Sequence, residues 1–227
     1  MSHDATTERR RHQQRRLTWV AGGVLLLLSV AVGLGARGPL AALSPGRDWL
    51  FAAAGVLLAI GIGHAGSITG RRFVGTVSTI LLVLAPVTQL YWFALVPDSA
   101  GDPNAAEDAW VLVAAAYFGV LVVLAVISVS AIVRAGVIPS PWRWAPLWVM
   151  LWTPVTFAIG VTVFSAAPLG TPIASFGAIL SLYGPAAGVA FLGVLAISLG
   201  ARRSSPEAPD ERWHRWSDDA LPDTPLP

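Results

Sequence analysis

The sequence predicts an all-α integral membrane protein, a six-helix transmembrane bundle with both termini in the cytoplasm and short disordered tails. Two observations lead to this prediction. Charged residues make up only 12% of the 227 residues and apolar residues 55%, whereas soluble domains carry about 25% charged residues. In addition, six apolar stretches are long enough to bridge about 30 Å of hydrocarbon, which takes roughly 20 helical residues.

The six expected spans contain no Asp, Glu, Lys or Arg. A single such charge at the centre of a membrane helix costs about 2.5–3.5 kcal/mol, so charge-free stretches of this length favour insertion. The apolar runs are continuous and lack the two-residue alternation of a barrel strand, and a helix pairs its own backbone groups within lipid. The expected spans are residues 17–36, 49–66, 73–96, 110–133, 144–166 and 175–200.

The arginines set the expected orientation. All fifteen basic residues are arginine, and with a cytoplasmic N-terminus only Arg37 and Arg47 fall outside. Because cytoplasmic loops are enriched in Arg and Lys, this distribution predicts a cell-membrane protein with both termini in the cytoplasm. The loop at 97–109 carries four acidic residues and no basic ones, and it falls outside as a solvated acidic loop.

Polar tails flank the expected membrane domain of residues 17–200. Residues 1–16 form a basic tail and residues 201–227 are rich in Pro, Asp, Glu and Ser, so we expect both to be disordered and cytoplasmic. The first span is longer than the 7–15 apolar residues typical of a signal peptide, and we expect it to be retained. Neither tail is long enough for a soluble catalytic domain, which places the function in the helices or loops.

Internal prolines in the third and sixth spans define the candidate substrate site. Pro86 and Pro185 each remove a backbone donor, which bends a helix. Gln89, Tyr91 and Tyr183 place polar groups beside these two prolines. Broken helices at matching positions of two inverted halves are typical of a transporter's midplane site. The two halves share no residue-level similarity, however, and proline is common in membrane helices, so structural kinks are the favoured interpretation.

Small residues spaced four apart predict close helix packing in the second and sixth spans. Gly55, Ala59 and Gly63 form one such face, and Gly184 and Gly188 form a GxxxG pair in the sixth span. We interpret these five positions as helix-packing residues.

We find no motif for a catalytic centre, a cofactor or a metal. His64 is the one histidine within an expected span, and a haem held by two histidines would need a second. The spacing of the acidic loop matches no EF-hand. The net charge of +2 is too small to indicate nucleic-acid binding.

These observations favour a non-enzymatic component or subunit of a membrane complex. Its expected partners are membrane lipids and either other membrane subunits or a second copy of the chain. A small permease with a midplane site near the kinked third and sixth helices is the first alternative. The second is a lipid- or quinone-linked membrane enzyme, for which Trp144, Trp148 and Trp152 on one face of the fifth span would provide a platform.

Overall fold

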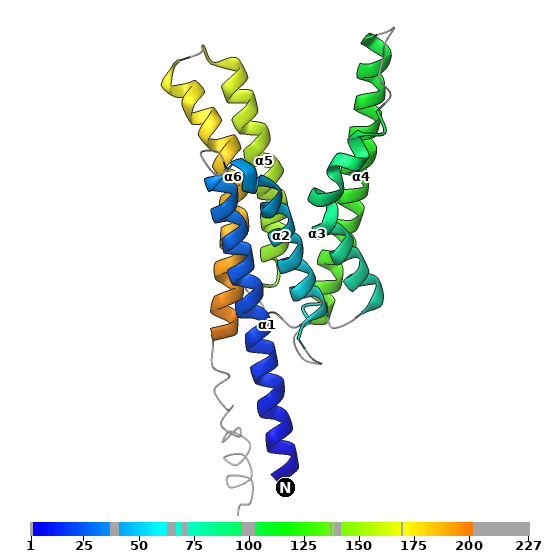
Figure 1. The fold of residues 1–227 in the computed structure, drawn as a ribbon, viewed down its shortest axis with the longest axis vertical. Coiled ribbons are helices and arrows are strands. Elements are labelled where there is room, and N and C mark those ends of the chain that lie inside the picture. The colour runs from blue at the N-terminus through cyan, green and yellow to red at the C-terminus, as the bar shows by residue number, and fades with distance from the viewer. Residues whose placement is uncertain are drawn as a thin grey trace, which may run out of the picture.

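A computed structural model describes residues 2–36, 41–62, 67–69, 72–96, 103–136, 138, 142–168 and 170–201. All regular elements in these ranges are helical, which confirms the all-α prediction for this part of the chain (Figure 1). The elements are α1 (Ser2–Gly35), the 3-10 helix η1 (Ala41–Leu43), α2 (Ser44–Ile60), α3 (Phe73–Phe93), α4 (Pro103–Ala135), α5 (Ala145–Ala166) and α6 (Pro172–Ala201).

Five of these helices are long and apolar enough to cross a membrane. The five segments are Gln13–Gly35, Phe73–Phe93, Ala106–Ala135, Ala145–Ala166 and Pro172–Ala201. They support a membrane-embedded protein, as the composition predicts.

Helix α2 differs from the expected span at 49–66 at both ends. It begins earlier, at Ser44, and ends at Ile60, so its 17 residues cover about 26 Å. A proline in its first turn suits the start of a helix. At the other end Gly61 has φ 73° and donates its N–H to the carbonyl of Leu57, which stops the helix within an apolar stretch.

Two charged segments that we expected outside regular structure are helical. Residues 2–16 extend α1, and residues 103–109 form the start of α4. The expectations of a disordered N-terminal tail and of a loop at 103–109 were therefore wrong. A helix that has already formed lengthens at little cost, and these segments are rich in good helix formers such as Ala, Arg, Gln and Glu. Residues 202–227 lie outside the described residues.

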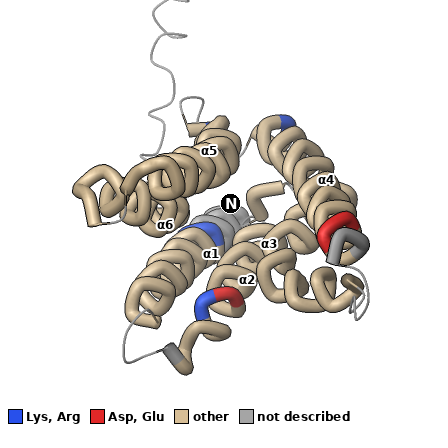
Figure 2. The backbone as a smooth tube through the Cα atoms, turned by 90° about the horizontal axis from the view of Figure 1, so that it is seen from above, with Lys and Arg blue, Asp and Glu red and all other residues tan. Residues whose placement is uncertain are grey.

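The helices pack as an open, curved row. Each helix packs against its neighbour in the order α5, α6, α1, α2, α3, α4, as Figure 2 shows end on. Helices α4 and α5 stand at the two ends of the row and have little contact with each other. Figure 1 shows that they diverge with distance from the N-terminal part of α1. As a result, α1 and α2 lie between α3 and α6.

Glycines lie at all five interfaces of this row. A Cβ atom added at any of them would approach the neighbouring helix far more closely than real side chains do. The nearest atoms would lie at 2.3 Å for Gly160 (α5 on α6), 2.6 Å for Gly23 (α1 on α6), 2.6 Å for Gly22 (α1 on α2), 2.4 Å for Gly55 (α2 on α3) and 2.3 Å for Gly75 (α3 on α4). Because glycine has no side chain, neighbouring helices can approach closely at these positions, and the glycines thus set the spacing of the helices.

An apolar cluster joins several helices at one end of their length. In it Trp19 of α1, Ile132 of α4 and Ala196 of α6 are buried against one another, together with Ile138, which follows α4. The described arginines near this cluster define what we call the basic end: Arg15, Arg16, Arg72, Arg134 and Arg143. We call the opposite end, where Arg47, Asp48, Glu107 and Asp108 lie, the acidic end.

Candidate functional site

The two halves of the expected substrate site lie on helices that are not neighbours. Pro86, Gln89 and Tyr91 belong to α3, whereas Tyr183 and Pro185 belong to α6. Helices α1 and α2 separate the two groups. Gln89 is exposed on the surface of the row, and Tyr91 is 73% exposed. The structure therefore does not bring these five residues together.

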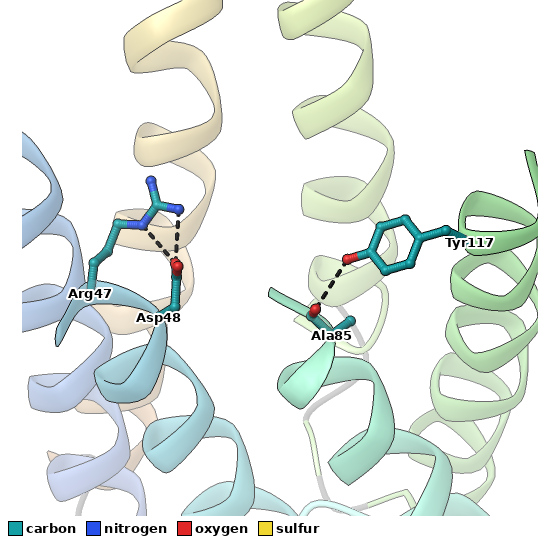
Figure 3. Close-up of polar contacts among 4 residues, drawn as sticks. All are labelled: Arg47, Asp48, Ala85 and Tyr117. Atoms are coloured by element: carbon teal, nitrogen blue, oxygen red, sulfur yellow. Dashed lines mark hydrogen bonds and ion pairs between the residues drawn. The ribbon is translucent and has the colours of Figure 1, made fainter. Parts of the chain in front are cut away.

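A side chain of α4 donates a hydrogen bond to α3 next to Pro86. The buried Tyr117 donates its hydroxyl to the carbonyl oxygen of Ala85, the residue before Pro86, at 3.1 Å (Figure 3). Thr88 Oγ1 donates to the same oxygen at 3.1 Å. A buried tyrosine hydroxyl needs a partner, and the cost of leaving it unpaired is higher in lipid than in water. This bond therefore fixes α4 against α3 beside Pro86.

Tyr117 is also the centre of an aromatic cluster between α3 and α4. Its ring centroid lies 5.8 Å from Trp92, 5.9 Å from Phe93 and 5.5 Å from Phe118. Phe93 in turn stacks on Trp110 at 5.4 Å. Aromatic pairs of this geometry contribute about 0.5–1.5 kcal/mol each beyond the burial of their area. The cluster joins the acidic-end half of α4 to α3.

The proline of α6 has a similar environment. Trp152 of α5 donates its indole N–H to the carbonyl oxygen of Gly184, the residue before Pro185, at 2.8 Å. A Cβ added at Gly184 would lie 2.6 Å from Thr156, and one at Gly188 would lie 3.0 Å from Val149. Side chains of α5 thus cover α6 around Pro185.

No motif in the sequence marks Tyr117 or Trp152 as partners of the proline-containing helices. Both come from the helix next to the proline-containing one, and each donates to the carbonyl that precedes the proline. The only signal in the sequence is an aromatic residue with an N–H or O–H group inside an apolar span. That signal does not say which helix will be the neighbour.

The small residues of α2 face its neighbours. Gly55 lies against Val83 of α3, where a Cβ would be 2.4 Å from that side chain. Ala59 is fully buried, and its carbonyl accepts a hydrogen bond from Ser67. Gly63 and His64 lie outside the described residues.

Buried hydroxyl groups anchor the chain where α2 ends. Ile62 donates its N–H to Thr18 Oγ1 of α1 at 2.8 Å. Ser67 Oγ donates to the carbonyl of Ala59 at 2.5 Å and lies 3.0 Å from Thr69 Oγ1. Because the last carbonyls of a helix have no partner within the helix, these hydroxyls supply the missing donors. The connection to α3 is thereby held at the basic end.

A cavity of about 260 Å³ lies at the basic end between the start of α3 and the end of α4. Arg72 and Arg134 line it together with Ser130 and several apolar residues. The sequence does not distinguish either arginine as a site residue, because each resembles the other arginines expected at the cytoplasmic ends of the spans. Their shared cavity depends on the packing of α3 on α4.

No protein-family model, curated protein or solved structure matches this chain. The geometry of the helix row is therefore the basis of the functional proposal.

We predict that Tyr117→Phe destabilises the protein by about 1 kcal/mol, because it removes the hydroxyl donor to Ala85 and keeps the ring of the aromatic cluster. Thermal unfolding in mild detergent should show a midpoint lower by roughly 2–4 °C. The control is Tyr91→Phe, which removes the same group from an exposed side chain and should leave the midpoint unchanged. Equal midpoints for both variants and the unaltered protein would contradict a structural role for the Tyr117 hydroxyl.

Proposed function

We propose that this protein crosses the cell membrane six times, with both termini in the cytoplasm, and acts as a non-enzymatic subunit of a membrane complex. In this proposal the outward face of α4 binds a transmembrane helix of a partner.

The course of α2 along α1 supports a sixth crossing. A Cβ at Gly33 of α1 would lie 2.6 Å from Arg47 Cδ near the start of α2. Just beyond the other end of α2, Ile62 bonds to Thr18 of α1 at 2.8 Å. Helix α2 therefore runs antiparallel beside about 22 Å of α1, the stretch between Thr18 and Gly33. If α1 crosses the hydrocarbon, α2 passes through nearly the same thickness in the opposite direction.

The distribution of charge supports the orientation. Five described arginines lie at the basic end, which is the side expected in the cytoplasm. At the acidic end, Arg47 pairs with Asp48 at 2.8 Å (Figure 3), so its charge is locally balanced. Glu107 and Asp108 add negative charge at that end. These features favour the basic end as the cytoplasmic one.

Gly119 is the observation that carries the proposal of a partner. Among the described glycines more than one turn from a helix end, it alone has no atom within 4 Å of an added Cβ. The others of this group all lie against a neighbouring helix. Gly119 thus has the character of an interface glycine but no neighbour among the described residues.

The surroundings of Gly119 suit a second helix. Gly119 follows Tyr117 by two residues, or about 200° around the helix, so it faces away from α3. Ala115, four residues earlier, is also exposed and completes a small-xxx-small pair. Large apolar side chains flank this pair on the same outward face: Leu112, Val122 and Val123 are all exposed. We call this surface the Gly119 face.

The topology is tested by reporter fusions. A reporter placed after Arg72 should behave as cytoplasmic and one placed after Asp102 as external, because three crossings separate the N-terminus from the second position. A helix α2 that fails to cross would put the first reporter outside. The reverse result at either position would contradict six crossings with a cytoplasmic N-terminus.

The role as a subunit is tested by substitution in the Gly119 face. We expect the unaltered chain, extracted from its native membrane within polymer-bounded lipid particles, to show a native mass above that of one chain. Gly119→Leu should raise the dissociation constant of the assembly about tenfold or more and release the single chain, because the added side chain blocks close helix approach.

The matched control is Ala158→Leu, which enlarges an exposed small residue on α5 and should leave the assembly intact. A single-chain mass for the unaltered protein, or equal behaviour of the two variants, would refute the proposed partner surface.

A further inference from the structure

We propose that the cavity between α3 and α4 at the basic end binds the phosphate of an anionic phospholipid. This inference goes beyond the proposed function and does not depend on a partner at the Gly119 face. It requires only that the basic end lies at a membrane surface.

Two arginines from different helices line the cavity. Arg72 immediately precedes α3 and Arg134 lies in the last turn of α4. Both side chains are exposed, and neither forms an ion pair with any residue in the described ranges. Both positive charges would attract an anion bound in the cavity. The arrangement therefore suits a negatively charged ligand.

The chemistry of the lining favours a phosphate. Guanidinium groups present several N–H donors in a fixed plane that match the oxygens of a phosphate, and Ser130 adds a neutral hydroxyl. The volume of about 260 Å³ exceeds the space of a single water or small ion. The cavity therefore has room for a phosphate diester.

The apolar part of the lining favours a lipid over a free anion. Val74, Val126 and Ile127 line the same cavity, and Val74 and Val126 are 65% and 60% exposed. They belong to the segments of α3 and α4 that are long and apolar enough to cross a membrane. An acyl chain that runs along these two helices would cover both valines, whereas inorganic phosphate would leave them uncovered.

Close packing of α3 on α4 forms part of the cavity wall. A Cβ at Gly75 would lie 2.3 Å from Ala131 Cβ, and both residues line the cavity. The headgroup therefore cannot pass between the helices and stays near the arginines. Basic cavities between membrane helices on the cytoplasmic side are a general means of holding anionic headgroups.

Native mass spectrometry of the full chain in mild detergent tests this site. The protein is titrated with phosphatidylglycerol and, separately, with phosphatidylcholine of the same acyl chains. We expect tighter binding of phosphatidylglycerol, because only this lipid carries a net negative charge. The double variant Arg72→Gln, Arg134→Gln should lower its affinity roughly 30-fold and leave the binding of phosphatidylcholine unchanged.

The matched control is the double variant Arg15→Gln, Arg16→Gln, which removes two exposed charges at the same end but outside the cavity. It should change the affinity by no more than about threefold, within the range of long-range screened charge effects. A loss equal to that of the cavity variant would overturn the proposal, because general electrostatics would then explain the binding.

A second variant keeps both arginines. Ser130→Phe fills the cavity without changing its charge and should also abolish the preference for phosphatidylglycerol. Retention of that preference would overturn the proposal even if the arginine variant failed to fold. Displacement of the lipid by inorganic phosphate would also overturn it, in favour of a free-anion site. Because the substitutions of Arg72, Arg134 and Ser130 leave Gly119 unchanged, these outcomes are independent of the test for assembly.

Discussion

Close contact at glycines is the constraint on which the helix row depends. Lipid removes the hydrophobic drive between helices, so their association rests on close packing and a few hydrogen bonds. Each interface of the row has a glycine at which a Cβ would come within 3 Å of the neighbouring helix. This constraint also gives the exposed Gly119 its meaning, since the other interior glycines with described surroundings all have a neighbour.

Hydrogen bonds and charges add specificity to this packing. The bonds from Tyr117 to Ala85 and from Trp152 to Gly184 fix two helix pairs beside their prolines. The apolar cluster around Trp19 draws α1, α4 and α6 together at the basic end, whereas α4 and α5 diverge toward the acidic end. The proposed functions follow this division, with a lipid at the closed basic end and a partner helix on the outer face of α4.

The sequence predicts the helical class and the cores of the helices, because hydropathy alone determines them. It cannot predict where α2 ends: Gly61 to Gly66 continues the apolar run, yet the helix stops at a positive φ and Ile62 turns to Thr18. The row order is equally inaccessible, since contacts such as Gly23 on Gly193 join distant segments. For this reason the expected site between α3 and α6 has no common surface, and the arginine cavity was not foreseen.

The most direct test of the central claim is the unfolding free energy of Gly160→Ala in mild detergent, compared with Gly119→Ala. The added methyl at Gly160 would lie 2.3 Å from the backbone nitrogen of Ser181, which cannot yield as a flexible side chain would. A loss of about 1–3 kcal/mol is expected. For the single chain carrying Gly119→Ala, the free energy should stay unchanged or rise by up to about 1 kcal/mol, because alanine favours a helix. Equal stability of the two variants would contradict the dependence of the row on its glycines.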